Sequence, residues 1–205
     1  MYFLDILGTL AFAITGAFKA KKAKLTIFGV VFLGVITALG GGTVRDLIIN
    51  RTPLFYLIDS NYLFAAISGS IFTFLAPTFF KKRFSIFRFI DSIGLATFSI
   101  IGVSVTYNYI FTDTSPGIRS FLPCVLLGMV TAFAGGIIRD AVMGDVPFAL
   151  KSGSNYALSS FLGASAFYLL MFYNINIAMA VSIIVALFMR EVVSDYGIYK
   201  KILRK

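Results

Sequence analysis

The sequence predicts an all-α integral membrane protein with seven transmembrane helices, arranged as two inverted three-helix repeats plus a seventh helix. Three observations support this prediction. The 205 residues are 59% hydrophobic and only 13% charged, whereas about a quarter of the residues in a soluble domain are charged. The basic residues gather in alternate linkers, and one half of the chain repeats the other.

Seven apolar segments fill nearly the whole chain, and each is roughly long enough to cross about 30 Å of hydrocarbon. They run near residues 2–18, 26–49, 61–79, 89–111, 120–143, 155–173 and 177–194. We expect one membrane domain over residues 1–205, with repeat one at 1–80, repeat two at 87–173, and the seventh helix and tail at 177–205. The first segment has no basic region or cleavage site, so we interpret it as a retained helix.

The distribution of Lys and Arg predicts the orientation. The linker at 19–24, the linker at 81–88 and the tail at 200–205 each carry four basic residues, whereas linkers 51–60, 112–119 and 174–176 carry at most one. The linker at 144–154 is weak, with Lys151 against Asp145. The positive-inside rule then places the N-terminus outside and the C-terminus in the cytoplasm. The net charge of +9 lies in these short clusters, which suit anionic lipids and argue against nucleic-acid binding.

The internal repeat is read directly from the sequence. A shift of 94 residues superimposes Leu33–Tyr62 on Leu127–Tyr156 without a gap, and matches Gly, Thr, Arg, Asp, Pro and Asn positions together. A shift of 86 aligns the preceding segments, including Asp5 with Asp91 and Phe12 with Phe98. Three helices are an odd number, so the two copies are expected to cross the membrane in opposite senses.

Glycine runs interrupt the second and fifth segments, and each glycine costs about 1 kcal/mol in a helix. Such a run either breaks the helix and exposes carbonyls to a water-filled path, or lets two helices approach closely. The repetition of the run before Arg-Asp favours a break that lines a path. The candidate pore glycines are Gly40, Gly41, Gly42, Gly135 and Gly136.

Each glycine run is followed by an Arg-Asp pair, Arg45-Asp46 and Arg139-Asp140. Successive residues point about 100° apart on a helix, so the members of a pair are not expected to face each other. Topology instead predicts an ion pair of Asp5 with Arg45 near the outer face. It predicts the equivalent pair, Asp91 with Arg139, near the inner face.

These ion pairs would have a mainly structural role, locking each three-helix unit together. Asp46 and Asp140 would then face the lumen and attract potassium or sodium ions, with Arg45 and Arg139 positioning ions or gating. Thr37 and Thr131 are weaker candidates for the pore lining, because such hydroxyls more often bond back to their own helix.

Enzyme signals are missing from the sequence. There is no histidine, the single cysteine is Cys124, and no nucleotide-binding loop or metal-ligand spacing is present. We therefore expect no enzyme activity, no cofactor and no metal site.

The segments Gly-Gly-Gly-Thr-Val-Arg-Asp at 40–46 and Ala-Gly-Gly-Ile-Ile-Arg-Asp at 134–140 resemble the prokaryotic trimeric intracellular cation channel family. The same bacterial domain is also described as glycine-transporter-like. The resemblance implies a homotrimer in which each protomer has its own pore, shaped by glycine kinks and passing chiefly potassium. The Lys-Glu-Val motif of the lipid-binding animal relatives is absent here, so the resemblance implies a bacterial or archaeal protein of the plasma (inner) membrane.

Three functional hypotheses follow. The first is a monovalent cation channel. The alternative is a secondary transporter of a small zwitterion such as glycine, in which broken helix ends bind a carboxylate and an ammonium. The third is a structural or lipid-binding membrane protein without flux.

Overall fold

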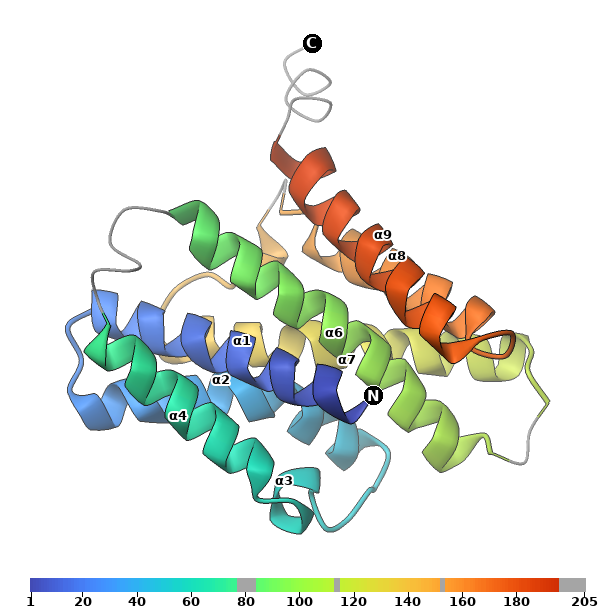
Figure 1. Ribbon diagram of the computed structural model, residues 1–205, viewed down its shortest axis with the longest axis horizontal. Coiled ribbons are helices and arrows are strands. Elements are labelled where there is room, and N and C mark those ends of the chain that lie inside the picture. The colour runs from blue at the N-terminus through green and yellow to red at the C-terminus, as the bar shows by residue number, and fades with distance from the viewer. Residues whose placement is uncertain (77–83, 113–114, 152–153, 196–205) are drawn as a thin grey trace.

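The structure is a computed structural model that describes residues 1–76, 84–112, 115–151 and 154–195, and the described part is built from helices (Figure 1). The basic residues at 81–83 and in the tail at 200–205 lie outside these residues. The elements are α1 (Tyr2–Lys22), α2 (Ile27–Ile48), α3 (Phe55–Ile58), α4 (Asn61–Leu75), α6 (Phe84–Ile110), α7 (Ile118–Val142), the 3-10 helix η1 (Phe148–Leu150), α8 (Tyr156–Leu170) and α9 (Ile175–Asp195).

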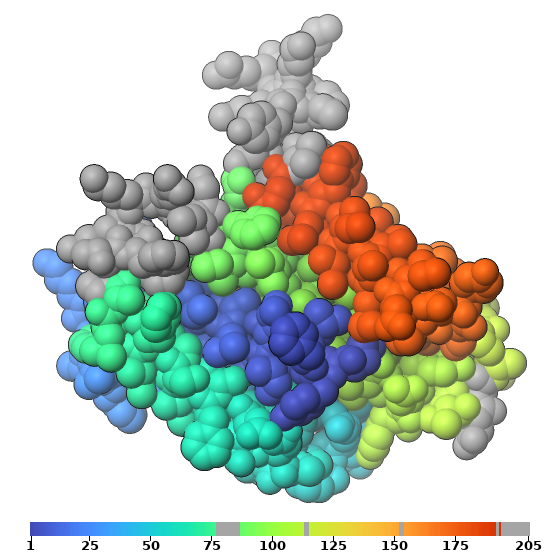
Figure 2. All heavy atoms as spheres, in the orientation of Figure 1, coloured from blue at the N-terminus to red at the C-terminus, as the bar shows by residue number. Residues whose placement is uncertain are grey.

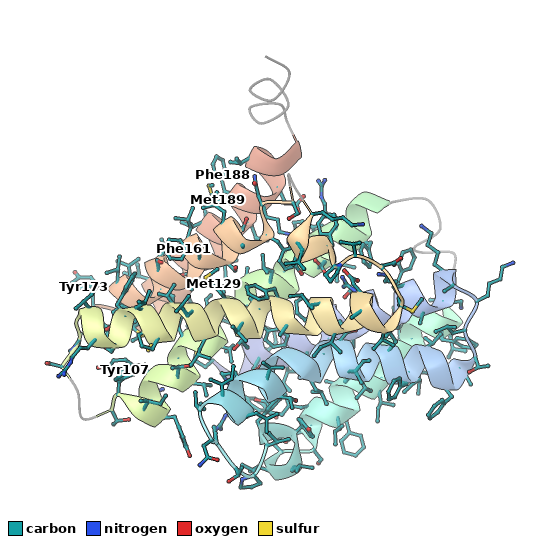
Figure 3. All side chains as sticks on the ribbon, turned by 180° about the vertical axis from the view of Figure 1, so that it is seen from behind. Tyr107, Met129, Phe161, Tyr173, Phe188 and Met189 are labelled. Carbon is teal, nitrogen blue, oxygen red and sulfur yellow. The ribbon has the colours of Figure 1, made fainter. Side chains whose placement is uncertain are left out.

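Four of the described helices are long and apolar enough to cross a membrane: α1, α2, the Phe87–Ile110 part of α6, and α7. The apolar helices α4 and α8 have 15 residues each, which gives them a length of about 22 Å. Large apolar side chains point outward, and Figure 3 shows Phe161 on α8, Tyr173 in the turn after it and Phe188 on α9. The chain is therefore an all-helical, multi-pass membrane protein.

The helices pack as two groups that meet through α1, α2, α6 and α7. In the first group α1, α2 and α4 pack against one another, and in the second α6, α7 and α8 do so, with α9 against α8 and α6. Contacts of α2 with α7 and of α1 with α6 join the groups. Figure 2 shows the start of α1 on one face of the molecule, between α4 and α9. A site between the groups is thus framed by α1, α2, α6 and α7.

The contact between α1 and α6 depends on two phenylalanines and two glycines. Phe12 and Phe98 meet edge to face, with ring centroids 5.1 Å apart. A Cβ atom on Gly94 would lie 2.2 Å from Phe12 Cδ1, and one on Gly8 would lie 3.2 Å from Phe98 Cε1. Each ring therefore rests on the glycine surface of the other helix, which brings the two helices close together.

Candidate functional site

The two helix groups come into backbone contact at the glycine runs of α2 and α7. A Cβ atom on Gly41 would lie 2.1 Å from the Thr131 carbonyl oxygen, and one on Gly135 would lie 2.2 Å from the Thr37 carbonyl oxygen. Both helices continue through these positions without interruption. The expected break that exposes carbonyls is therefore absent in this structure, and the glycines serve close helix packing instead.

The other three glycines differ in how much space surrounds them. A Cβ atom on Gly40 would lie 2.9 Å from Ile138 Cδ1, and one on Gly42 would lie 2.6 Å from Phe55 Cε1. At Gly136 the nearest atom, the Tyr156 hydroxyl oxygen, is at 3.4 Å. The tight contact at the crossing is therefore concentrated at Gly41 and Gly135, where the neighbour is backbone and cannot rotate away.

The threonine hydroxyls at this crossing are occupied by their own helices. Thr37 Oγ1 donates to the Leu33 carbonyl at 2.6 Å, and Thr131 Oγ1 donates to the Leu127 carbonyl at 2.7 Å. Both side chains are buried. They satisfy their polar atoms locally, as threonines in membrane helices commonly do.

At one end of the crossing, Arg45 pairs with its own neighbour. Its Nε donates to Asp46 Oδ1 at 2.9 Å and its Nη2 lies 2.8 Å from the same oxygen. The expectation that adjacent residues would not pair is wrong, because the long arginine side chain curls back around the helix to reach the shorter carboxylate. Asp46 is fully buried, and Arg51 Nη1 lies 3.5 Å from it.

The predicted Asp5–Arg45 ion pair does not form. Asp5 Oδ2 instead accepts a hydrogen bond from the Tyr62 hydroxyl at 2.9 Å, and Arg45 is held by Asp46. Asp5 and Arg45 line the same cavity of about 240 Å³, whose wall also includes Gly42, Arg51 and Thr131. Space therefore separates the two charges, and we call this space the outer cavity, after the orientation that the sequence predicts. Asp46 is not part of its wall.

At the other end, the predicted ion pair of Asp91 with Arg139 is confirmed. Arg139 Nη1 lies 3.0 Å from Asp91 Oδ1, and both side chains are buried. Asp91 Oδ2 accepts two more hydrogen bonds, from Arg190 Nη2 at 2.6 Å and from the Tyr156 hydroxyl at 2.8 Å. The carboxylate is thus saturated by groups from α7, α8 and α9.

Asp140 is held by a second set of donors. Arg139 Nε donates at 2.8 Å, Lys19 Nζ at 2.7 Å and the Phe148 backbone N–H at 2.8 Å. Lys19 also lies 2.7 Å from Asp145, and this ammonium group lowers the pKa of the exposed Asp145 carboxyl. Asp91, Arg139 and Asp140 line a cavity of about 660 Å³, which we call the inner cavity.

The sequence analysis did not identify three groups of residues that contact the carboxylates at the two cavities. Tyr62 and Tyr156 stand at the end of the repeated Ser-Asn-Tyr triplet, so the repeat itself could have indicated that they act on Asp5 and Asp91. Arg190 and its neighbour Glu191 are the only charges in the last apolar segment, which was a usable signal because such charges are rare in membrane helices. Lys19 was interpreted only as one of the basic linker residues that determine the orientation in the membrane.

The model of the family described as Glycine transporter matches residues 2–78 and 88–172. The chain belongs to this family. A UPF0126 membrane protein of Vibrio cholerae is 35% identical over 164 residues, which cover 80% of this chain but only 65% of that protein. The UPF0126 inner membrane protein YadS of Escherichia coli is 36% identical over 175 residues, covering 82% of this chain and 79% of YadS.

Solved structures with the same fold are cation channels. The trimeric intracellular cation channel orthologue from Rhodobacter sphaeroides superimposes with a TM-score of 0.85 at 30% identity, covering 96% of this chain and 98% of that one. A prokaryotic channel of this kind in 0.5 M KCl gives a TM-score of 0.83 at 30% identity, covering 95% and 96%. These two structures are described as cation channels, which is consistent with the expectation of no enzyme activity.

We predict that Asp91→Asn destabilises the protein by about 3–5 kcal/mol, because it leaves the buried Arg139 and Arg190 without their shared carboxylate. Asp5→Asn is the matched control. Asn still accepts from Tyr62 and no arginine contacts position 5 among the described residues, so the loss should stay near 1 kcal/mol. Thermal unfolding of both purified variants measures the difference, and equal losses would contradict the asymmetry.

Proposed function

We propose that the protein is a monovalent cation channel, chiefly for potassium, with a conduction path inside each protomer of a homotrimer. The observation that supports it is the pair of polar cavities at opposite ends of the α2–α7 crossing, in a fold that is otherwise found in cation channels. On this proposal the path runs from the outer cavity to the inner cavity past Gly41 and Gly135.

The proposal includes seven membrane-crossing helices, α1, α2, α4, α6, α7, α8 and α9, with α1–α2–α4 and α6–α7–α8 as inverted repeats. Equivalent contacts in the two groups support it. Tyr62 donates to Asp5 as Tyr156 donates to Asp91. Likewise, Gly41 faces the Thr131 carbonyl as Gly135 faces the Thr37 carbonyl. Such reciprocal contacts are what a two-fold axis in the membrane plane produces.

The arginines of the motif need not exclude cations, because each is neutralised. Arg45 is paired with Asp46, and Arg139 lies between Asp91 and Asp140. On this proposal Asp5 faces the outer cavity and Asp140 the inner one, and these carboxylates attract cations. Asp46 acts through Arg45, since it is fully buried behind it.

The described conformation corresponds to a closed channel. Among the residues that the structure describes, none lines both the outer and the inner cavity, and the glycine Cα atoms face backbone carbonyls between them at the crossing. Conduction would then require α2 and α7 to separate or bend at the glycines, which are the points where a helix deforms most readily.

Planar bilayers containing the purified protein should show unitary potassium currents in the absence of any organic substrate. The second candidate function is a secondary transporter of a small zwitterion. It is supported by Asp5 and Arg45, a carboxylate and a guanidinium that line the same outer cavity. Electrically silent, saturable glycine uptake into proteoliposomes, without unitary currents, would reject the channel in favour of the transporter.

Gly135→Ala should raise the open probability of the channel. The added Cβ would lie 2.2 Å from the Thr37 carbonyl oxygen, so it disfavours the closed crossing. A bias of about 1 kcal/mol corresponds to roughly a fivefold change. Gly117→Ala is the control, because no atom lies within 4 Å of its Cβ position. Equal open probabilities in bilayer recordings of the two variants would show that the crossing is not the gate.

We also propose an inner-membrane location with the N-terminus outside and the C-terminus in the cytoplasm. The native Cys124 is buried, so an introduced cysteine can report the side of the membrane. An impermeant thiol reagent added to intact cells should label Ser115→Cys, in the linker before α7. It should spare Ala23→Cys, in the linker after α1. The opposite pattern would reverse the orientation.

A further inference from the structure

Lys19, at the end of α1, lines the inner cavity and contacts two carboxylates at once. Its Nζ lies 2.7 Å from Asp140 Oδ1 and 2.7 Å from Asp145 Oδ2. Asp140 belongs to the last turn of α7, and Asp145 follows in the linker to η1. On the proposed function Asp140 attracts cations, yet the free-standing cation that it holds in this structure is the protein's own ammonium group.

We infer that Lys19 is a built-in blocker of the inner cavity, whose ammonium group occupies a monovalent-cation site formed by Asp140 and Asp145. The inference rests on the proposed channel function and names the group that regulates the inner end of the path. A potassium ion that enters the inner cavity would have to displace the ammonium group from these carboxylates. Lysine suits this task because its ammonium group is a compact point charge on a flexible stem, unlike the planar guanidinium of arginine.

The linked charges around this site balance when one monovalent cation is present. Three carboxylates are joined there by ion pairs to two arginines, so the arginines leave one negative charge uncompensated. The carboxylates are those of Asp91, Asp140 and Asp145, and the arginines are Arg139 and Arg190. Charges taken out of water are stable only when they are paired. Lys19 supplies the missing positive charge, and a potassium ion in its place would do the same.

The other basic residues of the inner cavity do not take the place of Lys19. Arg88 forms its ion pair with Glu191, at 2.9 Å. Lys22 and Lys151 are exposed, and neither forms an ion pair with any residue that the structure describes. Water and salt screen such exposed charges, so they act only weakly on the two carboxylates.

The contacts of Lys19 allow its ammonium group to leave the site and to return. Its side chain is 21% exposed and that of Asp145 is 56% exposed, so water competes for one of the two ion pairs. Exposed ion pairs contribute little to stability. Asp140 does not depend on Lys19, because it also accepts hydrogen bonds from Arg139 Nε and from the Phe148 backbone N–H. Displacement by a cation therefore leaves the fold intact, as a reversible blocker requires.

The outer cavity has no equivalent of this ammonium group. The 86-residue shift that aligns Asp5 with Asp91 places Val105 at the position of Lys19, and Val105 lines the outer cavity. No lysine is found among the described residues that line this cavity. Block by a tethered ammonium group is therefore confined to the inner side, where potassium should compete with it.

Lys19→Met tests the inference in planar bilayers, because it removes the charge and keeps an unbranched side chain. The unitary potassium current should rise about fivefold, which corresponds to ~1 kcal/mol of lost block. Lys22→Met is the matched control. It removes a lysine at the same end of α1 that also lines the inner cavity but pairs with no carboxylate among the described residues. Its current should stay close to that of the unmodified protein, and equal currents in the two variants overturn the inference.

Lys19→Cys separates the charge of the side chain from its shape. Aminoethyl methanethiosulfonate, applied from the inner side, attaches an ammonium group through a disulfide and should lower the current again. Methyl methanethiosulfonate attaches a neutral methylthio group and should leave the current high. The unmodified protein is the control for Cys124, which is buried. The same effect of both reagents overturns the inference, because a charged blocker must distinguish them.

Thallium(I), a potassium mimic with strong anomalous scattering, tests the cation site without any current measurement. Crystals of Lys19→Met soaked in a thallium(I) salt should show thallium between Asp140 and Asp145, and crystals of the unmodified protein should show none there. Absence of thallium from this position in the variant overturns the inference, even if the variant conducts. Lys19→Cys serves in the same soak if Lys19→Met fails to fold. Thallium in the site without unitary currents in any variant would contradict the channel proposal and leave the cation site standing, so the two failures are distinguishable.

Discussion

The close approach of α2 and α7 is the constraint on which the rest of the structure depends. Gly41 and Gly135 each face a carbonyl of the opposite helix at a distance that leaves no room for a side chain. Because the contact is made by backbone, it fixes the relative position of the two helices and seals the space between the cavities. It also sets Arg45 and Arg139 at opposite ends of the crossing, so that each Arg-Asp pair belongs to its own cavity.

Burial of so many charges is tolerated because nearly every one is paired, and the pairing is richer at the inner end. Arg190 of α9 joins Arg139 on Asp91, and its guanidinium carbon lies 3.8 Å from the Tyr156 ring centroid. Asp5 has no arginine in a corresponding position, since α9 has no counterpart in the first group. Helix α9 therefore makes the two helix groups chemically different, with a saturated cluster around Asp91 and an unsaturated one around Asp5.

The sequence alone predicted the positions of the long helices and part of the charged site. The lengths of the apolar segments predicted the ends of the long helices to within about five residues. The internal repeat, with its shifts of 86 and 94 residues, correctly predicted the ion pair of Asp91 with Arg139. The same reasoning failed for Asp5 and Arg45, because Arg45 directs both Nε and Nη2 to Asp46, whereas Arg139 directs only Nε to Asp140 and keeps Nη1 for Asp91. Glycine runs were ambiguous in principle, since bending and close packing require the same residue. Only the position of the opposing carbonyls separates the two.

One position of the repeat carries opposite charges in its two copies, and this explains why the ion pairs at the two cavities connect different helices. Arg51 follows Asp46 by five residues and lies near it, but the position 94 residues later is Asp145, which repels Asp140 instead of neutralising it. Besides Arg139, the positive charge on Asp140 therefore comes from Lys19, at the far end of α1, whose Nζ lies 2.7 Å from both Asp140 and Asp145. This lysine couples α1 to α7 across the inner cavity, whereas Arg51 and Asp46 stay within one segment. Any movement that widens the inner cavity between α1 and α7 must break these ion pairs, of which the partly buried one to Asp140 is the stronger.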